Sequence, residues 1–162
     1  MKIFRACLLI PILLVVLLSI RLAARKTDFQ RTCLQVGNET IEAMVAKTAK
    51  ELENGLSVVD GLKDGQGMLF VFEKGARPIF HLGRVSSPLS IAFVNEKGKI
   101  LKIENMVPKK GDPLYVVPER IRYALEVPFG WFEKNRVKAG SRIKGNRKIL
   151  KDGETCFREG IA

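Results

Sequence analysis

Two apolar runs decide the fold of this chain: Gly67-Met68-Leu69-Phe70-Val71-Phe72 and Pro88-Leu89-Ser90-Ile91-Ala92-Phe93-Val94-Asn95. Continuous runs of this length, rich in aromatic and branched residues, are typical of strands that are buried on both faces. We therefore expect four of their large side chains in the core: Phe70, Phe72, Ile91 and Phe93. The polar connection between the runs carries the only histidine of the chain, His81.

The neighbouring segments predict further strands and short helices. Alternating residues flank a Gly-Asn turn and indicate a hairpin formed by residues 33–36 and 40–45. A capping box at Thr48 and Glu51 predicts a helix that ends near Gly55. The remaining expectations are a hairpin at 89–94 and 100–104, an irregular loop at 107–118, strands at 123–127 and 141–144, and a helix at 129–135.

The N-terminus carries an apolar leader. Residues 6–20 are almost entirely apolar, and they follow Lys2 and Arg5 in the order of an export signal. As a helix they would span about 22 Å, which is shorter than the roughly 30 Å hydrocarbon layer and favours a cleaved signal peptide. Leu22 is a poor residue for the cleavage site and favours a retained transmembrane anchor, so both interpretations stay open. Either one predicts export to the periplasm or cell envelope.

The length of 162 residues and a hydrophobic content of 46% fit one globular domain plus this appendage. We divide the chain into the leader at 1–25, a linker at 26–32, a single domain at 33–145 and a C-terminal extension at 146–162.

Two cysteines bracket the domain. Cys7 lies in the leader, which leaves Cys33 and Cys156 as the one pair that an oxidising compartment could join. We predict a disulfide between them that ties the C-terminal extension to the domain. The alternative is two unrelated thiols, since sequence alone does not bring them within bridging distance.

The formal net charge is +11, and many basic residues lie late in the chain. They are Lys134, Arg136, Lys138, Arg142, Lys144, Arg147, Lys148 and Lys151. Such a run could meet an anionic lipid or polymer of the envelope, but a solvated basic face is the preferred interpretation. The run lacks interleaved aromatics for base stacking, and nucleic acid is not an expected partner.

Four blocks in this order resemble the domain of unknown function 192 family: Gly55-Leu56, residues 67–72, residues 88–95 and residues 122–131. The resemblance covers about residues 33–144. It implies an α+β, mostly-β domain with a compact barrel-like antiparallel sheet and one or two short helices. It implies no reaction, because the family carries no established biochemical activity.

The chain departs from that family in its most polar segment. Relatives have an aromatic-Trp-Met-Lys-Asn-Thr string before the second apolar run, whereas this chain has Phe80, His81, Leu82, Gly83, Arg84 and Val85. Ser90 stands where the family has aspartate. If the string carries a common activity, we expect this protein to have lost or altered it.

Catalytic and metal chemistry find little support in the sequence. His81 with Ser86 or Ser87 lacks the acid of a serine triad, and one histidine with two distant cysteines makes a poor zinc site. No cofactor is expected. Glu126 alternates with apolar neighbours and is interpreted as solvent-facing, and Trp131 as a core anchor.

Three function classes stay open. The preferred one is a non-catalytic binding module of the envelope, whose ligand surface is formed by His81, Arg84, Ser86, Ser87 and Ser90. Its expected partners are an anionic or hydroxyl-rich envelope component and, if the leader is uncleaved, the membrane. The alternatives are an envelope enzyme acting on carbohydrate or another polar polymer, and a basic surface protein binding anionic lipid or nucleic acid. The sequence does not predict an oligomeric state.

Overall fold

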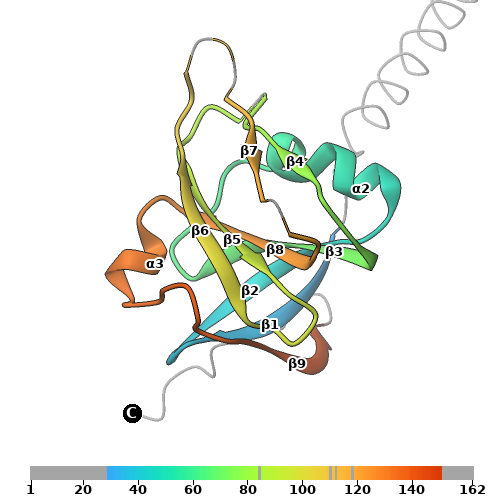
Figure 1. The fold of residues 1–162 in the computed structure, drawn as a ribbon, viewed down its shortest axis with the longest axis vertical. Coiled ribbons are helices and arrows are strands. Elements are labelled where there is room, and N and C mark those ends of the chain that lie inside the picture. Colours follow the sequence, from blue (N-terminus) through green and yellow to red (C-terminus); the bar gives the residue numbers. More distant parts are fainter. Residues whose placement is uncertain (1–28, 84, 110, 112, 118, 151–162) are drawn as a thin grey trace, which may run out of the picture.

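The computed structural model describes residues 29–150 except 84, 110, 112 and 118, and leaves the side chains of 146–150 undescribed. This part of the chain forms a seven-stranded sheet, a two-stranded sheet, two short α-helices and a 3-10 turn (Figure 1). The expected mostly-β fold with short helices is confirmed, and its sheet is curled into a half-barrel.

The main sheet has the strand order β6-β5-β8-β3-β2-β1-β9. Its strands are β1 (Gln30–Val36), β2 (Glu39–Ala46), β3 (Gln66–Ala76), β5 (Leu89–Val94), β6 (Ile100–Met106), β8 (Ile121–Pro128) and β9 (Ile143–Leu150). All neighbours are antiparallel except β2 and β3, which run parallel and are joined through α2 (Ala49–Asn54) and the 3-10 turn η1 (Gly55–Val58). The smaller sheet pairs β4 (Ile79–Phe80) with β7 (Tyr115–Val116), and α3 (Trp131–Lys134) follows β8.

The sheet curls until its two ends meet. The Ile100 N–H donates to the Ser141 carbonyl at 2.9 Å, and the Ile143 N–H donates to the Gly98 carbonyl at 2.8 Å. The start of β6 is thereby joined to the segment that leads into β9. Gly98 has φ +73°, and a Cβ there would lie 2.4 Å from the Ile143 carbonyl oxygen, so only glycine permits this approach.

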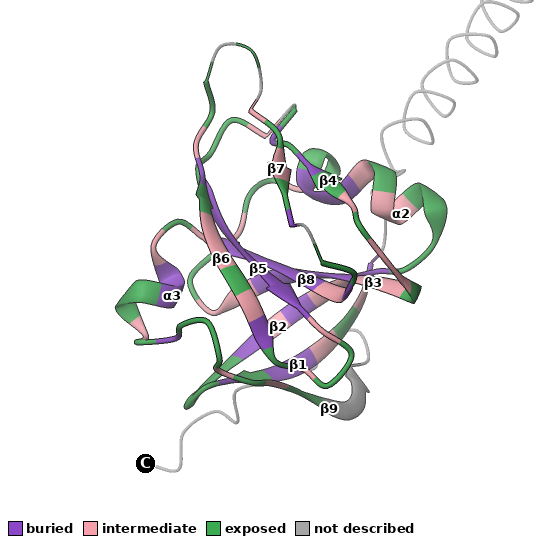
Figure 2. Cartoon of the chain, viewed as in Figure 1, coloured by how far each residue is buried: buried purple, intermediate pink, exposed green. Residues whose placement is uncertain are grey.

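β5 and the first half of β3 are buried on both faces, as their apolar runs predict, and the middle of β8 is buried on both faces as well (Figure 2). Phe70, Ile91 and Phe93 pack on the face that α2, η1 and β4 cover. Alternate residues such as Leu69 and Ala92 pack on the other face, together with the helix α3. Phe72, also expected in the core, is only partly buried.

The predicted capping box fixes the start of α2. The Glu51 N–H donates to the Thr48 hydroxyl at 3.3 Å, and the Glu51 carboxylate accepts from the Thr48 N–H at 2.9 Å. The backbone N–H groups of Thr48 and Lys47, which both donate to the Glu51 carboxylate, hold the pKa of Glu51 below its usual range. Gly55, with φ +47°, ends the helix as expected and lies against the Phe70 ring. None of the helices in the described part of the chain is both long and apolar enough to span a bilayer.

Two segments differ from their predictions. The loop expected at 107–118 contains β7, which pairs with β4 as a flap over the sheet. The last strand, expected at 141–144, is β9 and continues to Leu150, because β1 offers it an unpaired edge. The leader, the linker up to Asp28 and the extension beyond Leu150 lie outside the described residues.

Candidate functional site

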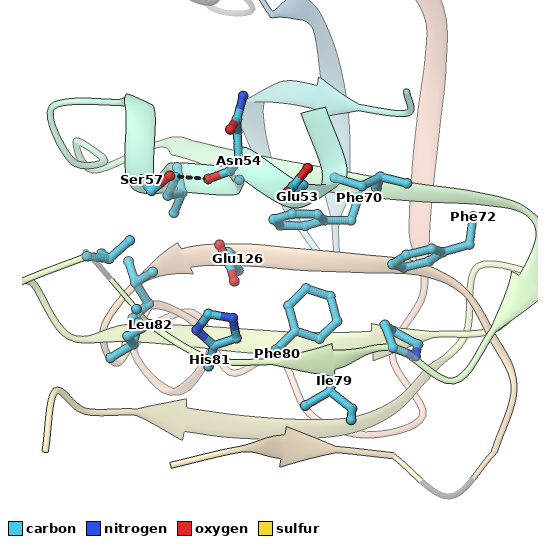
Figure 3. A pocket seen from close by; sticks show the side chains of 17 residues that line it. Glu53, Asn54, Ser57, Phe70, Phe72, Ile79, Phe80, His81, Leu82 and Glu126 are labelled. Carbon is cyan, nitrogen blue, oxygen red and sulfur yellow. Dashed lines mark hydrogen bonds between the residues drawn. The ribbon is translucent and has the colours of Figure 1, made fainter. Parts of the chain in front are cut away.

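A pocket of about 460 Å³ lies between the α2–η1 segment and residues 78–83, over the face of β3 and β8 (Figure 3). We call it the Glu126 pocket. Its apolar lining is Leu52, Leu56, Phe70, Phe72, Pro78, Ile79, Phe80, Leu82, Val85 and Leu89. Its polar lining residues with side chains are Glu53, Asn54, Ser57, His81 and Glu126. Cavities of this size and composition are typical of small-molecule sites.

Glu126 forms part of the pocket floor. It comes from the centre of β8, where its Cα partners are Met68 on β3 and Ile91 on β5, both fully buried. Only 4% of Glu126 is exposed, and no hydrogen bond or ion pair reaches its carboxyl from any described residue. Burial therefore raises the pKa of Glu126 to about 8.

The expectation that Glu126 faces solvent is wrong. The residue does alternate with Leu125 and Val127, which pack on the opposite face of the sheet. The face that carries Glu126 is not open to water, because α2, η1 and β4 cover it. Alternation along β8 thus separates two covered faces and not a wet face from a dry one.

An aromatic cluster walls the pocket beside Glu126. The Phe80 ring meets the Phe70 ring edge to face with centroids 5.2 Å apart, and meets the Phe72 ring at 6.4 Å. Phe80 also contacts Phe93 in the core at 5.9 Å. These contacts fix the β4 segment over the sheet, so the aromatic wall is part of the packed structure.

The mouth of the pocket carries Glu53, Asn54 and Ser57 on one side and His81 on the other (Figure 3). The Ser57 hydroxyl donates to the Asn54 carbonyl at 2.5 Å. His81 is exposed and its ring lies against Gly83, where a Cβ would be 3.0 Å from His81 Nδ1. Gly83 has φ +51°, so glycine fits this position in the chain on two grounds.

The structure separates the five residues expected to bind a ligand. His81 lines the pocket, whereas Ser86 and Ser87 are exposed beside it but do not line it. Arg84 lies outside the described residues. Ser90 is fully buried and is therefore not available at the surface.

Ser90 has a structural role instead. Its hydroxyl donates to Asn105 Oδ1 at 2.5 Å and accepts from the Gly130 N–H at 2.9 Å. Ser90 thus links β5, β6 and the turn before α3. Trp131, at the start of α3, is 4% exposed and packs against Phe132, which confirms it as a core anchor.

The late basic residues whose side chains are described lie on the surface. Lys134, Arg136, Lys138, Arg142 and Lys144 are all exposed. Lys134 pairs with Asp64 at 2.8 Å and Arg142 donates to the Lys97 carbonyl at 3.1 Å. Among the residues with a described placement, no three His, Cys, Asp or Glu side chains gather as metal ligands.

The chain is similar to known proteins in its fold and in its sequence family. Among the solved structures that match, two show that the fold is shared. One is a protein described as a candidate transcription regulator from Sinorhizobium meliloti 1021, with a TM-score of 0.65 and 24% identity, over 73% of this chain and 94% of that one. The other is a protein of unknown function from Novosphingobium aromaticivorans, with a TM-score of 0.68 and 20% identity, over 74% of this chain and 89% of that one.

The chain belongs to the domain of unknown function 192 family, described as "Uncharacterized ACR", whose model matches residues 32–145. The resemblance stated from sequence is therefore confirmed. No curated protein matches the chain. The Glu126 pocket lies wholly within the matched residues.

Proposed function

We propose that this chain is an exported, envelope-associated binding module and that the Glu126 pocket receives its ligand. The observation that carries the proposal is the Glu126 carboxyl, which is buried, has no partner among the described residues and faces a cavity of ligand size. A buried polar group that lacks a hydrogen-bond partner destabilises a fold by about 1–3 kcal/mol. A ligand that supplies the missing partner would recover that free energy, and strongly perturbed carboxyls in clefts are functional-site candidates.

Placement in the envelope is supported by the sequence. The apolar run at residues 6–20 behind Lys2 and Arg5 has the order of an export signal or membrane anchor. The pair Cys33 and Cys156 suits an oxidising compartment. A hydroxyl-rich envelope component would meet His81 at the mouth of the pocket and the exposed hydroxyls of Ser86 and Ser87 beside it.

Binding is favoured over nucleophilic catalysis by the hydrogen bond of Ser57. A serine nucleophile donates its hydroxyl proton to a base such as histidine. The Ser57 hydroxyl has one proton and donates it to the Asn54 backbone carbonyl, although His81 lines the same pocket.

One observation favours an enzyme as the second candidate. The Glu126 carboxyl has a pKa near that of a general acid, and Glu53 is a second carboxyl in the pocket lining. Two carboxyls that flank a sugar are the machinery of glycoside hydrolysis. Turnover of a glycan that disappears in Glu126→Gln would establish this candidate in place of the binding module.

The test is a ligand screen on the full-length chain in mild detergent. Small metabolites, glycans and anionic lipids are screened by protein-observed NMR, and hits are expected to shift the signals of Phe80, His81 and Leu82. Ser57→Phe places a ring over the mouth and should abolish binding without lowering the unfolding temperature, because Ser57 is exposed.

Lys50→Phe is the matched control. Lys50 is exposed on α2 and is outside the pocket lining, so the same ring at this position should leave binding intact. Hits that bind Ser57→Phe as tightly as the parent chain would show that the site lies elsewhere.

A further inference from the structure

We propose that the Glu126 pocket recognises an organic ammonium group, with the ammonium against Glu126 and its apolar body against Phe70, Phe72 and Phe80. This inference rests on the proposed function and names the chemical class of the ligand. The inference requires a ligand with a positively charged group, which meets the carboxyl, and an apolar body, which meets the aromatic rings.

The described lining of the pocket carries a charge opposite to that of the whole chain; Arg84, which follows Gly83 in the sequence, lies outside the described residues. The formal net charge of the protein is +11, yet the described residues that line the pocket include two carboxyls, Glu53 and Glu126, and no lysine or arginine. His81 is the only other titratable group among them. The nearest basic side chain on the same face of β8 is Arg122, and its guanidinium donates to the Phe72 carbonyl at 2.6 Å. A cationic group therefore meets carboxyls in this pocket and no described cation.

The position of Glu126 defines what the ligand must supply. The carboxyl lies between Met68 and Ile91 and has no partner among the described residues. In the free protein, burial keeps it protonated up to pH of about 8. An ammonium group offers both an opposite charge and N–H donors, and bonds of this charge-assisted kind are about twice as strong as neutral ones. Its arrival therefore converts Glu126 to the carboxylate and releases the proton.

The walls suit the rest of such a ligand. Phe70, Phe72 and Phe80 present aromatic surface within the same cavity, next to the aliphatic side chains of Leu52 and Leu56. Ammonium ions are attracted to aromatic faces, and their alkyl or aryl substituents gain from leaving water. A hydrophilic cation such as a free metal ion would use only the carboxyls and leave these walls unfilled.

The affinity for a neutral ligand should depend on pH in the opposite direction from the affinity for an ammonium ligand. A neutral acceptor would bind to protonated Glu126, and its affinity would fall as the pH rises through about 8. An ammonium ligand binds to the ionised carboxylate. Its apparent affinity should rise about tenfold per pH unit below that pKa and level off above it.

The experiment titrates the full-length chain with three probes of similar size: phenethylamine, phenethyl alcohol and hydrocinnamate. Calorimetry in buffers of different ionisation enthalpy measures the protons released. We expect phenethylamine to bind at least tenfold more tightly than the alcohol at pH 8, to release about one proton at pH 7, and to release few above pH 9. Hydrocinnamate should bind most weakly.

Variants assign the effect to one carboxyl. Glu126→Gln keeps the size of the side chain but cannot ionise, so the preference for the amine and the proton release should both disappear while the alcohol still binds. Glu53→Gln and His81→Gln remove the other titratable groups of the lining. These two variants can change the affinity for phenethylamine, but the rise of that affinity with pH should persist in both.

The inference is overturned if the alcohol binds as tightly as the amine, if affinity falls with rising pH, or if Glu126→Gln keeps the preference. Failure of all three probes also overturns it. The proposed function remains valid after any of these results if other hits from the screen bind the parent chain and do not bind Ser57→Phe. If the hits bind Ser57→Phe as tightly as the parent chain, both the proposed function and the ammonium inference are wrong.

Discussion

A single side chain, Glu126, gives the pocket its chemistry. Its neighbours across the sheet, Met68 and Ile91, are fully buried, and a carboxylate between two such residues loses most of its hydration. The charged form is therefore disfavoured, and the pKa of Glu126 rises to about 8. The carboxyl is uncharged in the free protein at neutral pH and becomes available for ionisation when a ligand changes its surroundings.

This raised pKa predicts how stability depends on pH. The unfolded chain ionises Glu126 near pH 4.5 and the folded chain near pH 8, so between these values the unfolded state carries fewer protons. The stability that Glu126 contributes is thus fully present below pH 4.5 and declines by about 1.4 kcal/mol per pH unit up to pH 8. Denaturant melts of the parent chain minus those of Glu126→Gln should show this decline.

The control for that measurement is Glu39→Gln. Glu39 is exposed at the start of β2, and its replacement should give a stability difference that stays flat over the same pH range. A flat difference for Glu126→Gln as well would mean that water or a rearrangement solvates the carboxyl.

Residue types alone could not place the site. Of the residues that the sequence singled out, His81 lines the Glu126 pocket, whereas Glu126 was interpreted as solvent-facing and Ser90 was expected at the surface. Period-two alternation shows which residues share a face, and it does not show whether a distant segment covers that face. β8 pairs with β3 and β5, and an acid at its centre is buried for that reason, but both pairings join segments that are far apart in the sequence.

At the scale of elements, the predictions held where local chemistry decides. The capping box at Thr48 and the positive φ of Gly55 fix both ends of α2 through contacts within a few residues. The central strands were recognisable because burial on both faces excludes polar residues from long runs. The flap strand β7 and the length of β9 were missed, since each depends on pairing with a segment far away in the sequence.

Side chains of the central strands should contribute strongly to the free energy of unfolding through their packing in the core. Ile91 in β5 is fully buried within the core that α2, η1 and β4 cover, so Ile91→Ala should lower the free energy of unfolding by about 2–5 kcal/mol. Ile79 in β4 is 59% exposed and provides the matched control, with an expected loss below about 0.5 kcal/mol for Ile79→Ala. Denaturant melts measure both. Equal losses at the two positions would contradict the assignment of the core.

At the scale of the whole molecule, the curled sheet depends on a strand from the C-terminal part of the chain. β9 covers the edge of β1, and the segment before it is bonded to the start of β6. The first and last described strands are therefore neighbours, and the pairing of β1 with β9 shifts register between Thr32 and Leu34, which is where Cys33 lies. The C-terminal extension thus begins beside the strand that carries Cys33.

This arrangement supports the prediction that Cys33 and Cys156 are bridged. Leu150 is the Cα partner of Arg31, and Cys156 follows it by six residues, outside the described part of the chain. Six residues reach at most about 20 Å, which is enough to return to Cys33. A bridge would close a loop of about 120 residues, and the chain-entropy model assigns such a loop roughly 4–5 kcal/mol of stability.

Mass spectrometry of the full-length protein, isolated under non-reducing conditions from cells with an oxidising envelope, should find the Cys33 and Cys156 peptides linked. Cys156→Ser and chemical reduction should lower the unfolding free energy by the same amount, because both open the same loop. Cys7→Ser is the control and should change nothing, since Cys7 belongs to the leader. If Cys33 and Cys156 both react with an alkylating agent in the native, unreduced protein, the bridge is absent, and β9 is held to β1 by backbone pairing alone.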